Sequence, residues 1–233
     1  MSLFVIGDTH LSLSTGKSMD IFGGWQDYEQ RLENNWRRLV TPEDTVVIPG
    51  DISWCMTLEE GLEDFRFLNS LPGRKILMKG NHDYWWCTKK KADEFFARNG
   101  FDTLNILHNN AYTCGGIAIC GTRGWFFDAE KDDDKKIVLR EAGRLRASIT
   151  AAKETGLEPV VFLHYPPLTL AGKCPEIYDV LVDEGIKRCY YGHLHSFSHA
   201  QAYNGTNEDG IKFTLVSGDY INFCPVYVAE NNK

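Results

Sequence analysis

Near its middle the chain reads Gly80-Asn81-His82-Asp83, directly after the largely apolar run Lys75 to Met78. The run predicts a buried strand, and the glycine predicts a turn at its end. Within that turn, Asn81 offers an amide oxygen, His82 a titratable nitrogen and Asp83 a carboxylate. These residues alone also suit an ordinary turn. The motif gains weight because four other strand-like runs end in possible metal ligands. Those runs end at Gly7-Asp8-Thr9-His10, Gly50-Asp51, His164 and Gly192-His193-Leu194-His195.

The composition indicates a globular, acidic protein. The 233 residues are 43% hydrophobic, which is enough to bury a large core in one or two domains. The sequence shows no repeat, low-complexity tract or linker, so we expect a single domain over residues 1–233. The net charge is −7 and no basic block is present. An extended DNA or RNA partner normally requires clustered Lys and Arg, which argues against one here.

The cysteines and the N-terminus indicate a cytoplasmic protein. Seven cysteines form an odd, scattered set without a C-x-x-C pair, which argues against a disulfide scaffold and a thiolate zinc site. The chain enters an apolar strand at Leu3 without the basic and apolar regions of a signal peptide. Apolar runs stay well short of the roughly 18 residues that a membrane span needs. We therefore expect a reducing compartment and no membrane association.

The first hundred residues alternate between strand-like and helical patterns. The expected strands are Leu3 to Gly7, Thr45 to Pro49 and Arg74 to Met78. The expected helices are Gln26 to Val40, Thr57 to Leu71 and Lys89 to Asn99. This rhythm predicts a parallel sheet with crossover helices. The carboxyl ends of such strands meet at one edge, where open α/β sheets place their sites.

The second half predicts another sheet, which we expect to be largely antiparallel. Short apolar runs surround turns at Asn109-Asn110 and Gly115-Gly116, and a long helical pattern continues to Ala152. A short helix near Pro175 to Val182 follows. The later strands are expected at 160–163, 188–191, 198–203, 211–216 and 225–228. The fold class is therefore α/β with two sheets.

The polar groups at the strand ends form one set of two carboxylates, four imidazoles and an amide oxygen. They are Asp8, His10, Asp51, Asn81, His164, His193 and His195. A nitrogen and oxygen set without sulfur suits Mn²⁺, Fe²⁺ or Fe³⁺, Co²⁺, Ni²⁺ or Zn²⁺ better than Ca²⁺. Seven ligands exceed the needs of one tetrahedral ion. They suffice for two ions about 3.5–4 Å apart if a carboxylate is shared.

In this order and strand context, the motifs resemble the calcineurin-like metallophosphoesterase superfamily. The likeness spans Asp8 to His195, and the chain is most similar to small bacterial members described as predicted phosphohydrolases. It implies a four-layer α/β/β/α sandwich of two mixed sheets flanked by helices. It also implies a division of the ligands between two ions. Asp8, His10 and His195 would hold the first, Asn81, His164 and His193 the second, and Asp51 would bridge them.

Such a centre predicts hydrolysis of a phosphate mono- or diester by a metal-bridging hydroxide. His82 is not needed as a ligand, so we expect it to assist the leaving group. The acidic charge favours a small phosphorylated substrate, such as a nucleotide or cyclic nucleotide. Two alternatives remain: a catalytically silent binding scaffold with this fold, and a nuclease.

The sequence departs from the resembled protein phosphatases just after Asp51. Those enzymes carry an Asp that partners the catalytic His, followed by an Arg, whereas Trp54 and Cys55 stand here. His82 must therefore be oriented by another group. Asp83 is a candidate, with a purely turn-stabilising role as the alternative. Arg123, in a glycine-flanked loop, is a candidate to bind the substrate phosphate in place of the missing Arg.

Overall fold

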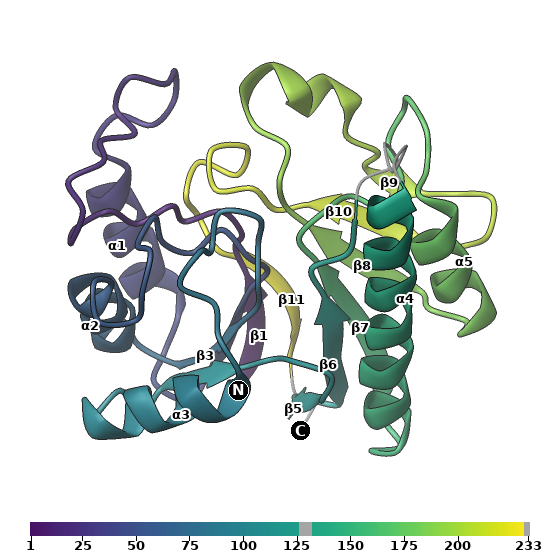
Figure 1. The fold of residues 1–233 in the computed structure, drawn as a ribbon, viewed down its shortest axis with the longest axis horizontal. Helices are drawn as coiled ribbons and strands as arrows, with labels where there is room; N and C mark the ends of the chain where they lie inside the picture. Colours follow the sequence, from purple (N-terminus) through teal and green to yellow (C-terminus); the bar gives the residue numbers. More distant parts are fainter. Residues whose placement is uncertain (126–131, 231–233) are drawn as a thin grey trace.

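The computed structural model describes residues 1–125 and 132–230, and two β-sheets face each other at its centre (Figure 1). The first sheet has the strand order β11-β1-β2-β3-β4, with β1 to β4 parallel and β11 antiparallel to β1. Its strands are β1 (Ser2–Val5), β2 (Thr45–Ile48), β3 (Arg74–Leu77), β4 (Leu104–Ile106) and β11 (Val226–Glu230).

The second sheet has the order β5-β6-β7-β8-β10-β9. Its strands are β5 (Tyr112–Cys114), β6 (Ile117–Thr122), β7 (Glu158–Leu163), β8 (Arg188–Tyr191), β9 (Gly205–Thr206) and β10 (Lys212–Leu215). The four central strands are parallel, and only the edge strands β5 and β9 pair antiparallel. The expectation of a largely antiparallel second sheet is therefore wrong. Helices connect β6 to β7 and β7 to β8, and such crossovers join parallel strands.

Helices cover the outer face of each sheet and complete four layers (Figure 1). The first sheet is covered by α1 (Tyr28–Leu39), α2 (Leu62–Ser70) and α3 (Lys89–Arg98). The second is covered by α4 (Asp132–Lys153) and α5 (Pro175–Asp183). Between the sheets, apolar side chains from both pack into a buried layer, among them Val5, Val47 and Phe162. The predicted α/β/β/α sandwich of two mixed sheets is confirmed.

Two predicted elements differ from the structure. The helix expected from Thr57 begins only at Leu62, because residues 58–61 form a separate turn, in which the Gly61 N–H donates to Thr57 O. The strand expected over 198–203 is instead a 3-10 helix, η1 (Ser196–Gln201). Ser198 Oγ accepts from His195 N at 2.7 Å and donates to His195 O. Such local side-chain bonds to the backbone compete with strand pairing.

No helix within the described ranges is both long and apolar enough to cross a lipid bilayer.

Candidate metal centre

The carboxyl ends of five strands bring all seven predicted ligands together. They follow β1, β2 and β3 of the first sheet and β7 and β8 of the second. The connections after these strands therefore deliver side chains from both sheets to one place. The residues are Asp8, His10, Asp51, Asn81, His164, His193 and His195.

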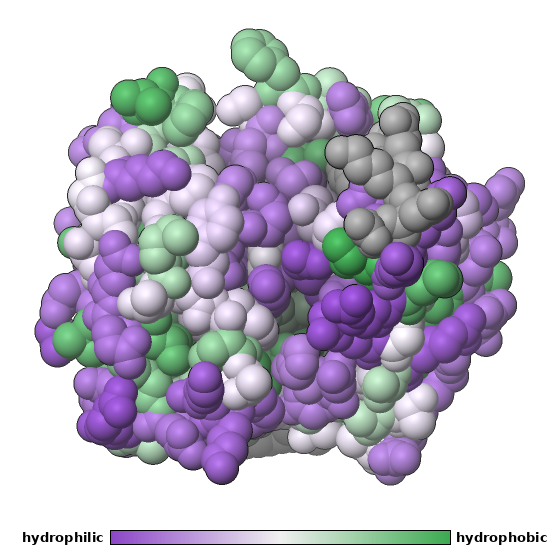
Figure 2. All heavy atoms as spheres, viewed as in Figure 1, coloured by the Kyte–Doolittle hydropathy of each residue, from purple (hydrophilic) through white to green (hydrophobic). Residues whose placement is uncertain are grey.

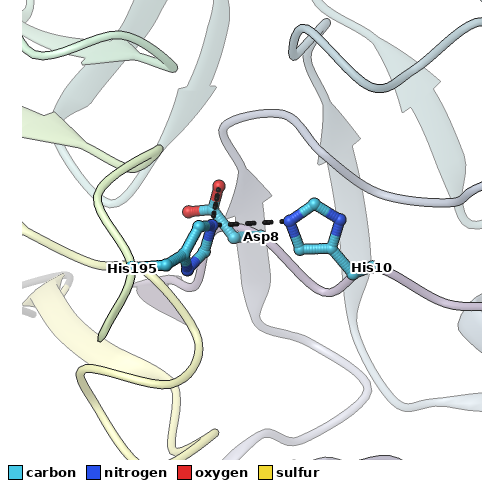
Figure 3. Close-up of side chains that lie close together, drawn as sticks. All are labelled: Asp8, His10 and His195. Carbon is cyan, nitrogen blue, oxygen red and sulfur yellow. Dashed lines mark hydrogen bonds and ion pairs between the residues drawn. The ribbon is translucent and has the colours of Figure 1, made fainter. Parts of the chain in front are cut away.

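Asp8, His10 and His195 form the first group (Figure 3). His195 Nε2 lies 3.4 Å from Asp8 Oδ1 and 3.4 Å from His10 Nε2. Asp8 and His10 are buried, and His195 is partly exposed. One carboxylate oxygen and two imidazole nitrogens thus face a common point.

Asn81, His164 and His193 form the second group. Asn81 Oδ1 lies 2.6 Å from His164 Nε2 and 2.9 Å from His193 Nδ1. His164 is fully buried at the end of β7, whereas Asn81 and His193 are partly exposed. The amide oxygen therefore completes a set of two nitrogens and one oxygen.

Asp51 lies between the two groups and turns one oxygen to each. Its Oδ2 is 3.6 Å from His10 Nε2, and its Oδ1 is 3.6 Å from His164 Nε2. Oδ1 also accepts the His82 N–H at 2.8 Å. A carboxylate in this position can serve two ions at once.

The donor spacing fits bound cations. Ligands at about 2.1 Å from one ion lie about 3.0–3.4 Å from each other, close to the separations above. The histidine tautomers agree with this use. His164 Nδ1 faces Pro49 O at 3.2 Å, and His195 Nδ1 faces Asp219 Oδ1 at 2.8 Å. Their outward nitrogens can therefore carry the proton, which leaves Nε2 free for a metal.

Burial shifts the pKa values of Asp51, His10 and His164 in the direction that favours their neutral forms. Burial, reinforced by the charges of Asp83 and Asp8, raises the pKa of Asp51 well above its usual value. Burial and the neighbouring His195 lower the pKa of His10, and burial with His193 does so for His164. Two cations would balance the buried carboxylates and use the neutral imidazoles as ligands.

Backbone strain is concentrated at these residues. Four of the seven have left-handed backbones: Asp8 (φ 55°), His10 (φ 41°), Asp51 (φ 51°) and His193 (φ 72°). A non-glycine residue in this region costs on the order of 1–3 kcal/mol, and such strain clusters at functional sites. The strain is therefore a reason, independent of the motif, to locate function here.

Two glycines leave room for the carboxylates. A Cβ at Gly80 would collide with Asp51 Oδ1, and one at Gly192 would collide with Asp8 Oδ2. The glycines of the G-N-H-D and G-H-x-H motifs are therefore required by close approach to the two acidic ligands.

The comparison with protein families agrees with this geometry. The model for calcineurin-like phosphoesterases matches residues 1–197. The chain belongs to this family. Family membership implies a metal-dependent hydrolase of phosphoesters.

Solved structures of the phosphoesterase fold resemble the chain along most of its length. A protein of unknown function, AQ665 from Aquifex aeolicus, is 18% identical with a TM-score of 0.54, covering 97% of this chain and 95% of that one. Phosphopantetheinyl hydrolase (PptH) from Mycobacterium tuberculosis is 14% identical, with a TM-score of 0.51 and the same coverage. The protein TT1561 of Thermus thermophilus is 11% identical, with a TM-score of 0.54 and 85% coverage of each chain. At these identities the likeness establishes the fold alone. Among curated proteins, none matches significantly.

In this member of the family, aromatic rings lie close to His82. Its ring centroid lies 4.5 Å from that of Trp54, and its Nδ1 lies 3.3 Å from the Tyr84 hydroxyl. Burial, with Lys17 and His195 nearby, lowers the pKa of His82. Lys17 comes from the loop after β1 and places its ammonium 3.3 Å from the centre of the Trp54 ring. Packing and a phenol, rather than a carboxylate, therefore orient His82.

Asp83 contacts backbone groups instead of the His82 side chain. The residue is buried, and burial raises its pKa to about 6 despite the N–H groups that point at it. Its two oxygens bind the loop after β2 to the loop after β3, and so fix the backbone of Asp51. The donors are Asp51 N (2.8 Å), Ile52 N (2.8 Å), Ser53 N (3.3 Å), Gly80 N (2.7 Å) and Trp85 Nε1 (2.9 Å).

Arg123 lies beside the centre and turns its side chain away from the ligands. Its carbonyl accepts His164 N at 3.2 Å and Tyr165 N at 2.9 Å. Its guanidinium lies 4.7 Å from the centre of the Trp125 ring and 3.9 Å from Glu141 Oε1. The Arg123 side chain, predicted to bind the substrate phosphate, thus lines a neighbouring pocket.

Sequence reasoning missed three residues that support the ligands. Trp25 packs its ring 5.6 Å from both His10 and His195. The Tyr165 ring lies 4.4 Å from that of His193. Asp219 binds His195 from the segment after β10. Only Tyr165, which directly follows a ligand, carried a local signal in the sequence.

Proposed function

We propose that the chain hydrolyses phosphate mono- or diesters with two transition-metal ions held by the seven side chains. The observation that carries the proposal is the position of Asp51, whose two oxygens lie 3.6 Å from His10 Nε2 and 3.6 Å from His164 Nε2. A carboxylate facing two ligand groups is the arrangement that a dinuclear centre requires. Family membership supplies the reaction class.

Each ion has its own side chains in this proposal. Asp8, His10 and His195 hold the first ion, and Asn81, His164 and His193 hold the second, with Asp51 common to both. The donor set suits manganese, iron, cobalt, nickel or zinc. When bound, such ions lower the pKa of water toward neutrality and offset negative charge on the phosphoryl group.

His82 assists the leaving group. Its Nδ1 faces the Tyr84 hydroxyl, so Nε2 is the nitrogen left to face substrate. A hydrogen-bond or proton donor at the leaving oxygen contributes about 10²–10⁴-fold to catalysis. Asp83 is a positioning residue in this scheme, because it holds the backbone of Asp51 rather than the substrate.

The proposed substrate is a small phosphorylated molecule, with nucleotides and cyclic nucleotides as leading examples. The net charge of −7 disfavours long nucleic acids. A catalytically silent scaffold is the second candidate. It is disfavoured because all seven candidate ligands and His82 are present, and a scaffold without catalysis would have no need of them.

Metal analysis combined with two chromogenic esters tests the proposal. We expect two ions per chain and turnover of bis-p-nitrophenyl phosphate, p-nitrophenyl phosphate or both. Asp51→Asn should lose metal and activity together, whereas Asp93→Asn, on the exposed face of α3, should lose neither. Two bound ions without turnover of either ester would favour the scaffold. Turnover by metal-free protein would refute the dinuclear mechanism.

A further inference from the structure

A pocket of about 240 Å³ lies beside the metal centre, where β3, β4 and β6 end. Its polar wall includes Lys79, Arg123, Glu141 and Arg144, together with Thr88, His108, Asn109 and Thr122. Met78, Trp86 and Leu107 supply apolar surface. Figure 2 shows a hollow near the middle of one face of the molecule, with strongly hydrophilic residues gathered along one side of it. The pocket can thus hold a polar group together with part of a carbon skeleton.

The charges of the pocket are unbalanced. Among the described residues of its wall, the one carboxylate is that of Glu141, which is already used: Arg144 Nη1 lies 2.6 Å from its Oε1, and Thr122 Oγ1 donates to its Oε2. Arg123 reaches Glu141 only at 3.9 Å. Its Nε is buried and has no hydrogen-bond partner among the residues 1–125 and 132–230. Lys79 is partly buried and makes no ion pair within the described residues. Among the residues that the structure describes, neither Arg123 nor Lys79 therefore has an anion closer than 3.9 Å.

A buried N–H without a partner is rare in folded proteins, and each instance calls for an explanation. Leaving such a group unsatisfied destabilises the folded protein, because the desolvation of the donor is not compensated. An anionic group in this pocket would accept from Arg123 and neutralise Lys79. Arginine and lysine are the side chains that bind phosphate most strongly.

The pocket is tied to the metal centre through the backbone. Lys79 precedes the ligand Asn81 by two residues, a span of at most about 7 Å. The Arg123 carbonyl accepts the N–H of the ligand His164 at 3.2 Å. A molecule whose phosphoryl group lies at the ions can therefore extend into the pocket, with a separation on the order of 10 Å between its two ends.

We propose that this pocket binds a second phosphate group of the substrate, remote from the one that is hydrolysed. This inference rests on the proposed function and narrows its substrate class to phosphate esters that carry another phosphate. A nucleoside 3′,5′-bisphosphate is a representative of that class. Arg123 then acts as a specificity residue, and Lys79 is its partner.

Kinetics with two substrates test the proposal. The probes are adenosine 3′,5′-bisphosphate and p-nitrophenyl phosphate, and the readout is the ratio of their kcat/KM values. Charge-assisted hydrogen bonds contribute about 1.5–3 kcal/mol, so Lys79→Met and Arg123→Met should each lower the ratio about 10- to 100-fold. Lys212→Met, at an exposed position on β10, should leave the ratio unchanged. An unchanged ratio in both pocket variants would overturn the proposal.

Binding measurements separate failure of this inference from failure of the proposed function. Calorimetry of the metal-loaded protein would compare adenosine 3′,5′-bisphosphate with adenosine 5′-monophosphate. Tighter binding of the bisphosphate, lost in Arg123→Met, would support the pocket even if neither compound were hydrolysed. Hydrolysis of simple esters with equal affinity for both nucleotides would reject the pocket and leave the hydrolase proposal intact.

Discussion

The indole ring of Trp54 packs against the imidazole of His82, with ring centroids 4.5 Å apart and planes inclined at 47°. In the protein phosphatases that the sequence resembles, a carboxylate stands at the position of Trp54. The two arrangements differ in chemistry, because a carboxylate stabilises a charged imidazolium whereas an indole mainly restricts where the ring can lie. In this chain, orientation of His82 depends on packing.

Removing the imidazole tests whether His82 acts in the reaction. We expect His82→Ala to lower kcat by about 10²–10⁴-fold while two metal ions remain bound, because none of the proposed coordination involves this ring. Steady-state kinetics and metal analysis of the same preparation provide the two readouts. Equal loss of metal and of activity would instead make His82 a structural support of the centre.

Truncating the indole tests the packing argument. We expect Trp54→Ala to lower kcat about 10-fold, since a freely rotating His82 spends less time in a productive orientation. Trp54→Phe keeps an aromatic surface and should retain most of the activity. If Trp54→Ala and Trp54→Phe lost the same amount of activity, contact with the aromatic face of residue 54 would not be what orients His82.

The contacts of Asp83 predict that its replacement lowers the stability of the folded protein. Its carboxylate accepts hydrogen bonds from four backbone N–H groups and an indole N–H in a buried position. We expect Asp83→Asn to lower the free energy of unfolding of the metal-free protein by about 2–4 kcal/mol, because an amide leaves some of these donors unsatisfied. Denaturant unfolding measures the change.

Asp93→Asn is the matched control for Asp83→Asn. Asp93 lies on the exposed face of α3, where it pairs with Lys89, and its loss should change stability by less than about 0.5 kcal/mol. Equal stabilities for the two variants would contradict the role of Asp83 as a clamp between the loops.

The convergence of the candidate metal ligands could be predicted from the sequence because strand patterning is local. Each candidate ligand closely follows a largely apolar run of four or five residues, or lies two residues beyond such a ligand. Parallel strands bring their carboxyl ends to one edge whatever the helices between them contain. Asp8 and His193 are 185 residues apart in the chain, yet the Asp8 carboxylate accepts the His193 N–H at 3.0 Å.

Other features depend on tertiary contacts that no local pattern encodes. The alternating residues of β10 predict a strand but not whether it runs parallel or antiparallel to β8. The sequence pattern alone therefore favours an antiparallel second sheet. Trp25 follows a loop whose path is set by packing on His10 and His195. Asp219 belongs to no motif, and its role follows only from its contact with His195.

Asp219 is predicted to support the first ion. It lies 2.8 Å from His195 Nδ1 and accepts Ser196 N at 3.1 Å, so it fixes both the tautomer and the orientation of the ligand. Loss of such a partner typically weakens metal binding about 10- to 100-fold. Asp219→Asn should therefore weaken binding of the first ion and leave binding of the second unchanged. Competition with a chelator would then remove the two ions in two separate steps.

A suitable control for Asp219→Asn is Asp179→Asn, at an exposed position on α5. It removes one negative charge at a distance from the ligands and should leave both affinities unchanged. An equal weakening of the two ions in Asp219→Asn would show a general loss of structure rather than support of His195.

Lys75 provides a test of pH dependence away from the metal centre. It is fully buried in β3, where its Nζ donates to Leu71 O and, at 2.8 Å, to Gly73 O. Burial lowers its pKa from 10.5 to about 7, with a smaller contribution from Arg37. Between these values the unfolded chain holds a proton that the folded chain lacks. The free energy of unfolding should therefore rise with pH across this window, by up to about 3–5 kcal/mol.

Lys75→Met removes the titrating group while keeping a chain of similar length. We expect its unfolding free energy to rise less steeply than that of the wild type between about pH 7 and 10, so that the difference between the two proteins grows with pH. The exposed variant Lys212→Met should instead follow the wild-type slope. Denaturant unfolding at several pH values measures all three. Parallel curves for the wild type and Lys75→Met would show that Lys75 titrates alike in both states, and that its ammonium is retained in the fold by the two carbonyl oxygens.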